Sequence, residues 1–243
     1  QARALARPSG LGRDRSGTRT GNDRCAVMRW LEAHAASPTL VTPARHRAVW
    51  LTGQSSWDQQ RLSPAQERFL LSLADHGWEP LLVGFPWTHR AAAGSYRRAA
   101  LLPASVRNTA QGLAARPGTA FAAEVTRHLQ PLLDATSSRL LLLCASAGAR
   151  LVTSAHRALQ VPPSLRIDVV GIGAVGALPP SHGPWHVKRA RGRSDVFSAL
   201  GDPAPADRIV PGGHLAAATS PAMLRAVLDL VPSVRSDPST AHS

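Results

Sequence analysis

The sequence predicts an α/β fold in which a mainly parallel, doubly wound sheet of about six strands is covered by helices on both faces. Short apolar runs recur along the chain, and each has the length of a strand buried on both faces. Segments with helical spacing of apolar residues separate these runs, as the crossover between two parallel strands requires. Because the links are short and neither an internal repeat nor a second core is evident, we expect one domain.

The predicted strands share an apolar run that stops at a turn. They cover residues 48–52, 79–84, 140–143, 166–172, 185–191 and 208–210. The run at 185–191 is more polar than the others, which is typical of a strand near the edge of a sheet.

The predicted helices begin at residues that cap a helix N-terminus. Ser63 is followed by Pro64 and Gln66, which is the arrangement of a capping box. Thr119 precedes a stretch of apolar residues at helical spacing, and Ser220 precedes the last predicted helix. Helices are therefore expected between the strands and after the last of them.

Net charge says little about the partner of this chain. It is +13, but Lys188 is the only lysine among the 28 basic residues. An arginine bias of this kind, with 44% apolar residues, is typical of GC-rich coding. No basic block interleaved with aromatic residues occurs, and no zinc-finger, RNA-recognition or helix-turn-helix motif is present. We therefore do not expect a nucleic acid as partner.

The N-terminal part is basic and begins with almost no large apolar side chain, which predicts disorder. A short helix starting at Asn22 would place Val27, Trp30 and Leu31 on one face. A transit peptide has a similar composition, although a solvated tail is favoured. The expected organisation is an arm over 1–45, a folded domain over 46–232 and a loose tail over 233–243.

Cysteine usage and hydropathy indicate the compartment. The two cysteines, Cys25 and Cys144, fall in the arm and in a predicted buried turn, so we expect free thiols and a reducing, cytoplasmic environment. No apolar run approaches the ~20 residues of a membrane span. No apolar signal-peptide core follows the basic start.

The stretch 138–153 carries the strongest functional signal. A leucine-rich strand breaks into small residues around Ser146 and resumes as a helix, which is the layout of a nucleophile elbow. Strand and helix approach closely in such a turn, so the positions two residues either side of the serine must be small. These positions are Cys144 and Gly148. An ordinary strand followed by a small-residue turn has the same composition.

Other candidate site residues also follow predicted strands. In an open parallel sheet, ligand chemistry gathers outside the carboxyl ends of the strands. Gly53 and Gln54 follow the first strand, Ser146 the third, Asp195 the fifth and His214 the sixth. A serine hydroxyl is a weak nucleophile at neutral pH, so it needs a base within hydrogen-bond reach and a carboxylate that orients the base.

From residue 47 to 231 the chain resembles the α/β-hydrolase fold superfamily, in which the triad runs in the order Ser, Asp, His. The matching segments are residues 51–55, 144–148, 192–195 and 212–214. The resemblance implies that Ser146 is the nucleophile, Asp195 the orienting acid and His214 the general base. It also implies an oxyanion hole made by the backbone N–H of Ala147 with that of Gln54 or Ser55.

This resemblance implies a serine hydrolase that cleaves a small-molecule carboxylic ester or thioester through an acyl-enzyme, without a cofactor. The alternative is a non-catalytic α/β-hydrolase-like binding protein. The chain departs from the family pattern in having Cys144 for glycine in the elbow and Thr52-Gly53 for the usual His-Gly. It also lacks an evident N-terminal hairpin, and its lid segment and the helix before His214 are short.

Several rival assignments stay open. Asp202 and Asp207 are alternative acids, and the thiol of Cys144 is an alternative nucleophile, although its side chain is expected to point into the sheet. The irregular segment 88–118 has the composition of either an insertion over a pocket or a long connection. The G-x-G-x-x-G pattern at 171–176 lacks a following helix, so we interpret it as a chance match. No metal-ligand spacing occurs among the histidines and cysteines.

Overall fold

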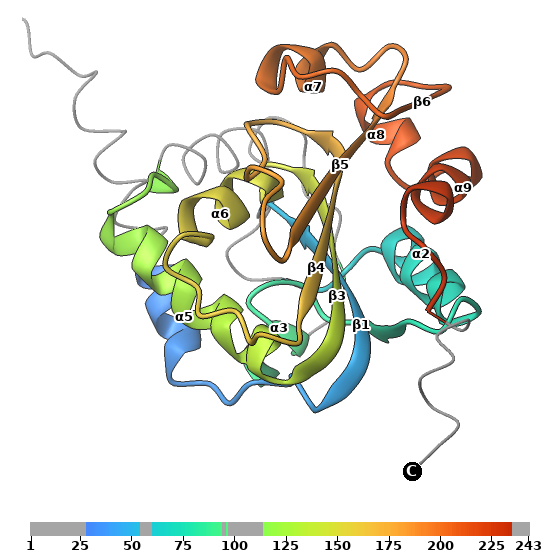
Figure 1. Cartoon of the computed structure of the whole chain (residues 1–243). Helices are drawn as coiled ribbons and strands as arrows, with labels where there is room; N and C mark the ends of the chain where they lie inside the picture. Colours follow the sequence, from blue (N-terminus) through green and yellow to red (C-terminus); the bar gives the residue numbers. More distant parts are fainter. Residues whose placement is uncertain (1–27, 54–59, 94–95, 97–113, 235–243) are drawn as a thin grey trace, which may run out of the picture.

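The computed structural model of the chain describes residues 28–53, 60–93, 96 and 114–234 (Figure 1). Six parallel strands form one sheet in the order β2-β1-β3-β4-β5-β6. Their bounds are Ala44–Thr52 (β1), Glu79–Leu81 (β2), Thr136–Ser146 (β3), Arg166–Ala174 (β4), Trp185–Gly192 (β5) and Arg208–Val210 (β6). The α/β class and the predicted number of strands are therefore confirmed.

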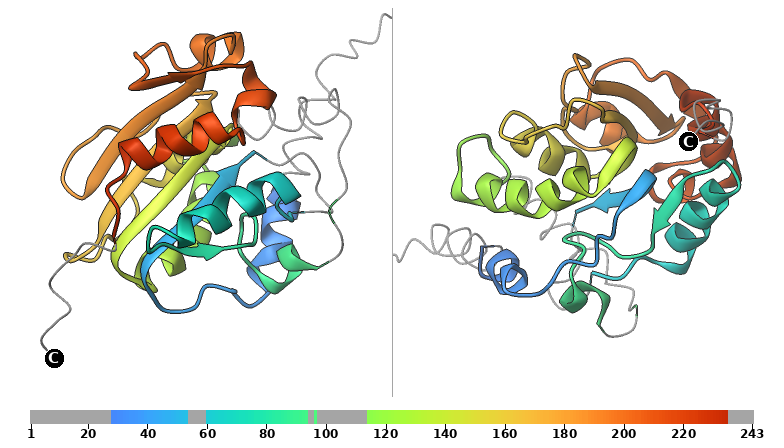
Figure 2. Two further views of the ribbon diagram at one scale, coloured as in Figure 1. Left: turned by 90° about the vertical axis from the view of Figure 1, so that its right-hand side faces the viewer. Right: turned by 60° about the horizontal axis from the view of Figure 1, so that its bottom comes forward.

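Helices cover both faces of the sheet, as expected from its buried strands (Figures 1 and 2). They are α2 (Pro64–Ala74), α3 (His89–Ala92), α5 (Ala120–Asp134), α6 (Gly148–Ala155), α7 (Val196–Gly201), α8 (His214–Ala217) and α9 (Pro221–Leu230). One hydrophobic core lies between the sheet and the helices α5 and α6, and the other between the sheet and the helices α2 and α9. Strand β3 belongs to both, because Leu140 and Leu142 face the first core while Leu141 and Leu143 face the second.

The helix starts predicted at Ser63, Thr119 and Ser220 are the observed ones. The Ser63 hydroxyl accepts the backbone N–H of Gln66 at 3.3 Å, and the Gln66 side chain accepts the N–H of Ser63 at 2.8 Å, which completes the capping box. Thr119 and Ser220 cap α5 and α9 through the same kind of bond. Each bond satisfies an N–H group that has no partner within its helix.

The order of the strands sets the place of the site. The chain starts near the middle of the sheet with β1, adds β2 on one side, and then returns to place β3 and the later strands on the other side. The connections therefore leave β1 and β3 in opposite directions, and such a switch point is where open α/β sheets bind their ligands. Ser146 is the last residue of β3.

The packed part of the chain begins before the predicted domain boundary. Residues 28–35 are helical, and Trp30 and Leu31 are buried in the core that contains α5. The expected boundary at residues 45 and 46 falls inside β1. The apolar face with Trp30 and Leu31, which the sequence had placed on a short helix of the arm, packs on the core instead of remaining in solvent. Residues 1–27, with Asn22, Cys25 and Val27, lie outside the described part.

The C-terminal end is likewise docked further than expected. Val234 is buried against the core on the α9 side, and its N–H donates to the carbonyl of His76 at 3.3 Å. Residues 235–243 of the predicted tail, and most of the segment 88–118, lie outside the described residues. Within the parts of the chain that are described, every helix is too short or too polar to span a bilayer.

Candidate active site

The three predicted triad residues lie along the carboxyl edge of the sheet, which is the upper edge in Figure 1. Ser146 ends β3, Asp195 follows β5 as the residue that caps α7, and His214 begins α8 after β6. Parallel strands bring their carboxyl ends to one edge, so residues far apart in the sequence share this face.

Ser146 occupies a strained turn between β3 and α6. Its φ is 49°, a left-handed value that is rare for a residue with a side chain. Two residues later, a Cβ on Gly148 would lie 2.1 Å from the carbonyl oxygen of Leu51 in β1, so only glycine fits there. The close approach of helix and strand that the sequence pattern requires is therefore present. Ala147 is the N-cap residue of α6, which places its backbone N–H at the start of that helix.

Cys144 lies inside the core. It is fully buried among the residues that pack under α5 and α6, with Leu51 and Gly171 beside it on the neighbouring strands. Burial raises the pKa of its thiol far above the ordinary value, so the thiolate does not form at neutral pH. A thiol without access to solvent or charge cannot act as a nucleophile, and Cys144 is a packing residue.

Asp195 and His214 form a hydrogen-bonded pair. The His214 Nδ1 lies 3.0 Å from each carboxylate oxygen of Asp195. A carboxylate can only accept, so the Nδ1 carries a proton, and in the neutral imidazole Nε2 then has the free lone pair. The Asp195 side chain is 1% exposed and that of His214 is 19% exposed. The carboxylate is thus shielded from water while the imidazole reaches the surface.

The carboxylate of Asp195 is held from a second side by α7. The backbone N–H of Ser198 donates to Oδ1 of Asp195 at 3.0 Å, so the same carboxylate caps the helix and orients the imidazole. Sequence reasoning did not single out Ser198, although an aspartate three residues before a helical N–H is a recognisable capping pattern.

The end of β4 lies against this pair. Gly173 has a φ of +53°, and a Cβ there would lie 2.7 Å from Oδ2 of Asp195 and 3.5 Å from Nδ1 of His214. The next residue, Ala174, is the register partner of Ser146, and the N–H of Val175 donates to the Ser146 carbonyl at 2.9 Å. The end of β4 therefore connects Ser146 to the pair, and within the glycine pattern at 171–176 it is Gly173 that packs against Asp195 and His214.

One predicted contact is absent, and another involves residues that the structure does not describe. Within the described residues, no hydrogen bond joins the Ser146 hydroxyl to the His214 ring, whose Nδ1 is bonded to Asp195. Gln54 and Ser55, the expected second donors of an oxyanion hole, lie outside the described residues.

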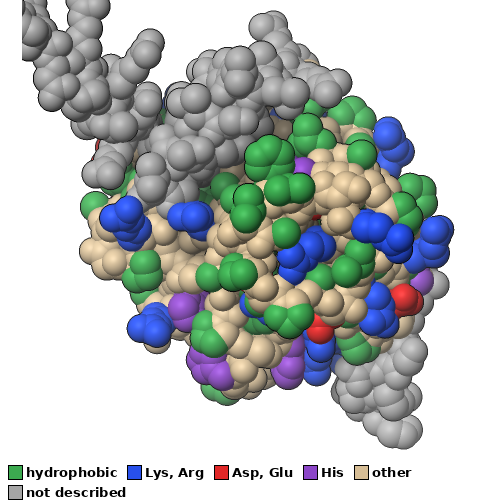
Figure 3. All heavy atoms as spheres, turned by 90° about the horizontal axis from the view of Figure 1, so that it is seen from above, with side chains coloured by type: hydrophobic (Ala, Val, Ile, Leu, Met, Phe, Trp, Pro, Cys, Tyr) green, Lys and Arg blue, Asp and Glu red, His purple; other side chains and the backbone are tan. Residues whose placement is uncertain are grey.

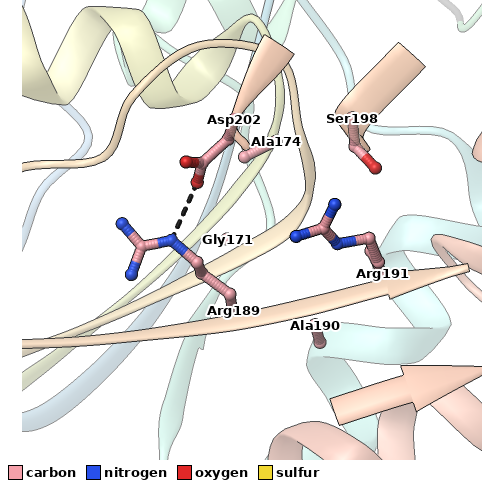
Figure 4. Close-up of a pocket in the computed structure, with 7 residues that line it drawn as sticks. All are labelled: Gly171, Ala174, Arg189, Ala190, Arg191, Ser198 and Asp202. Carbon is pink, nitrogen blue, oxygen red and sulfur yellow. Dashed lines mark hydrogen bonds and ion pairs between the residues drawn. The ribbon is translucent and has the colours of Figure 1, made fainter. Parts of the chain in front are cut away.

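The two rival acids are engaged elsewhere. Asp202 is buried and pairs with the Nε of Arg189 at 2.8 Å, beside a cavity of about 10 Å³ between β5 and α7 (Figure 4). That volume holds roughly one water molecule and no substrate. Asp207 accepts the backbone N–H of Arg189 at 2.8 Å and lies 3.6 Å from the Lys188 ammonium. Neither carboxylate bonds to His214, so Asp195 is the acid that the geometry supplies.

A larger open hollow lies at the opposite edge of the sheet. Its walls are the segments before β4 and β5, residues 161–166 and 183–184. It is remote from the carboxyl ends of the strands, and Arg166 is its only ionisable residue, already paired with Asp168. The carboxyl edge, where the Asp195–His214 pair lies, is therefore the candidate site. Comparison of the sequence with models of known protein families and with curated proteins gives no match.

Proposed function

We propose that the chain is a serine hydrolase of the α/β-hydrolase fold, cleaving a carboxylic ester or thioester through an acyl-enzyme on Ser146. The observation that carries the proposal is the pair of Asp195 and His214, tied by 3.0 Å hydrogen bonds at the edge where Ser146 occupies its strained turn. Serine, then aspartate, then histidine along the chain is the order of this fold.

In the proposed acylation, His214 acts as base through Nε2, because Nδ1 is held by Asp195. As the Ser146 oxygen bonds to the substrate carbonyl carbon, its proton moves to Nε2 and the carbonyl π electrons move to the oxygen. Collapse of this intermediate breaks the bond to the leaving group, whose oxygen or sulfur takes the proton from Nε2. Asp195 stays ionised and stabilises the imidazolium in between.

Deacylation repeats the sequence with water. Nε2 accepts a proton as the water oxygen bonds to the acyl carbon, and returns it to the Ser146 oxygen as that bond breaks. The net reaction consumes one water and releases an acid and an alcohol or thiol. The backbone N–H of Ala147 would donate to the oxyanion in both steps, since it stands at the N-terminus of α6.

The competing assignment is a binding protein with an inactive site, favoured by the missing bond between Ser146 and His214. In substrate-free hydrolases the bond between nucleophile and base is often long and tightens on binding, so this absence does not decide between them. If the chain is a binding protein, Asp195 serves only to cap α7 and to hold His214.

A fluorophosphonate probe separates the two functions. We expect covalent labelling of the folded protein, abolished in Ser146→Ala. The matched control is Ser194→Ala, because Ser194 is exposed on the same face beside Asp195 and should leave labelling intact. A folded protein that takes no label would identify a binding protein. Label that survives in Ser146→Ala would mean that the nucleophile is another residue.

A further inference from the structure

Exposed apolar side chains gather beside the Asp195–His214 pair. Among the described residues, eight large hydrophobic side chains are exposed, and five of them fall between residues 196 and 215. Four form what we call the apolar rim: Val196 (63% exposed), Phe197 (69%), Leu200 (79%) and Leu215 (65%). Single exposed hydrophobic residues are ordinary on a soluble surface, whereas a group of them marks a binding surface.

The apolar rim is built on the two short helices that hold the pair. Val196, Phe197 and Leu200 share the outer side of α7, whose Ser198 is turned inward and buried. Leu215 directly follows His214 at the start of α8, which contacts α7. On this face, Figure 3 shows hydrophobic side chains grouped near a histidine, with basic side chains both among them and towards the border.

The rim reaches the imidazole itself. The ring of Phe197 stands edge-on to that of His214, with centroids 5.7 Å apart and planes at 61°. A molecule lying on α7 would therefore extend directly over His214.

The chemistry of the proposed reaction decides which half of the substrate lies there. Nε2 of His214 must come within hydrogen-bond reach of the leaving-group atom in order to protonate it. The carbon chain bonded to that atom starts beside His214, whereas the acyl chain starts at the carbonyl carbon on Ser146. The neighbours of the imidazole are thus neighbours of the leaving group.

We propose that the leaving group is an apolar alcohol whose carbon chain docks on the apolar rim, which makes the substrate class esters of lipophilic alcohols. This inference rests on the proposed hydrolase function, because it uses His214 as the group that protonates the leaving oxygen. Phe197 and Leu200 are then the residues that select the alcohol.

Two isomeric esters test the inference. Hexyl acetate and ethyl hexanoate contain the same atoms, but the long chain is in the alcohol of the first and in the acyl group of the second. Primary straight-chain alcohols leave with similar intrinsic ease, and the difference between the acyl groups is the same for every protein variant. A change in the ratio of kcat/KM for the two esters between wild type and a rim variant therefore reports binding of the alcohol chain. For the wild-type protein we expect a ratio of about ten in favour of hexyl acetate, as partial burial of several methylene groups would give.

The variants Phe197→Ser and Leu200→Ser should each bring this ratio towards one. Leu200 is useful because it lies a helical turn from Phe197 and so probes the rim at a distance from the imidazole. The matched control is Leu71→Ser on α2, an exposed hydrophobic residue outside the rim, which should leave the ratio unchanged.

Each contrary result identifies what fails. A wild-type ratio of one or less overturns the inference, as does an equal loss on both esters in Phe197→Ser and Leu200→Ser. If the probe labels Ser146 but hexyl acetate is not hydrolysed, the hydrolase assignment stands and the inference about the leaving group falls. If no probe labels Ser146 and neither ester is cleaved, both fall.

Discussion

Replacement of Gly173 by alanine tests whether the contact between β4 and the Asp195–His214 pair matters for the reaction. The new Cβ would lie 2.7 Å from Oδ2 of Asp195, whereas ordinary contacts begin at 3.4 Å. The carboxylate must therefore retreat by about 0.7 Å, or β4 must move by as much. Since a misplacement of about 1 Å in a catalytic group can cost about a hundredfold, we expect kcat/KM to fall by tens of fold to about a hundredfold.

The same substitution also carries a backbone cost, which a matched variant isolates. Gly183 has a φ of +54°, almost equal to the +53° of Gly173, but its Cβ would meet nothing within 4 Å. Both Gly173→Ala and Gly183→Ala should lose about 1–2 kcal/mol of unfolding free energy from the left-handed conformation. Only Gly173→Ala should lose turnover as well.

Urea unfolding and ester hydrolysis measure these two effects separately. If Gly173→Ala hydrolyses esters as fast as Gly183→Ala does, the position of the Asp195 carboxylate does not limit the reaction, and our reasoning about the pair is wrong. If Gly183→Ala loses turnover to the same extent, the loss comes from general destabilisation.

Three further predictions concern the acid, pH and the N-terminal helix. Asp195→Asn should lower kcat by orders of magnitude, about 10⁴-fold in related chemistry. Asp202→Asn and Asp207→Asn should change kcat little. If steady-state assays give the opposite ranking, Asp202 or Asp207 is the acid and not Asp195. Burial lowers the pKa of His34 to about 4 from an unfolded value of 6.5, so the unfolded state binds more protons between these values. The unfolding free energy should therefore fall by at most roughly 3 kcal/mol from pH 6.5 to pH 4, and a His34→Gln protein with an equally steep pH profile would contradict this. Leu31→Ala should cost about 2–5 kcal/mol, because Leu31 is fully buried, and a loss below 1 kcal/mol in urea unfolding would mean that the helix does not dock.

Local signals in the sequence account for most of the fold. The capping residues Ser63, Thr119 and Ser220 set the starts of three helices through bonds made within a few residues, so no tertiary information is needed to find them. The leucine run of β3 is apolar at every position because both of its faces are covered. The order of Ser146, Asp195 and His214 at three strand ends is also readable along the chain.

Other features depend on residues that meet only when the chain folds. The sequence favours Asp195 as the acid because it follows a predicted strand, but leaves Asp202 and Asp207 as alternatives. In the structure, Asp195 bonds to His214, whereas Asp202 pairs with Arg189 and Asp207 with Lys188.

The tertiary structure likewise determines the packing role of two short segments, around Gly173 and around Trp30 and Leu31. Gly173 belongs to a glycine pattern that the sequence alone does not explain. It contacts the Asp195–His214 pair because β4 ends beside β5, after which Asp195 follows. Trp30 and Leu31 follow an arginine-rich segment that suggests a solvated arm, yet they complete the core on the α5 side. The sequence shows which side chains are apolar and therefore favour burial. Which surface buries each of them depends on how distant elements pack together.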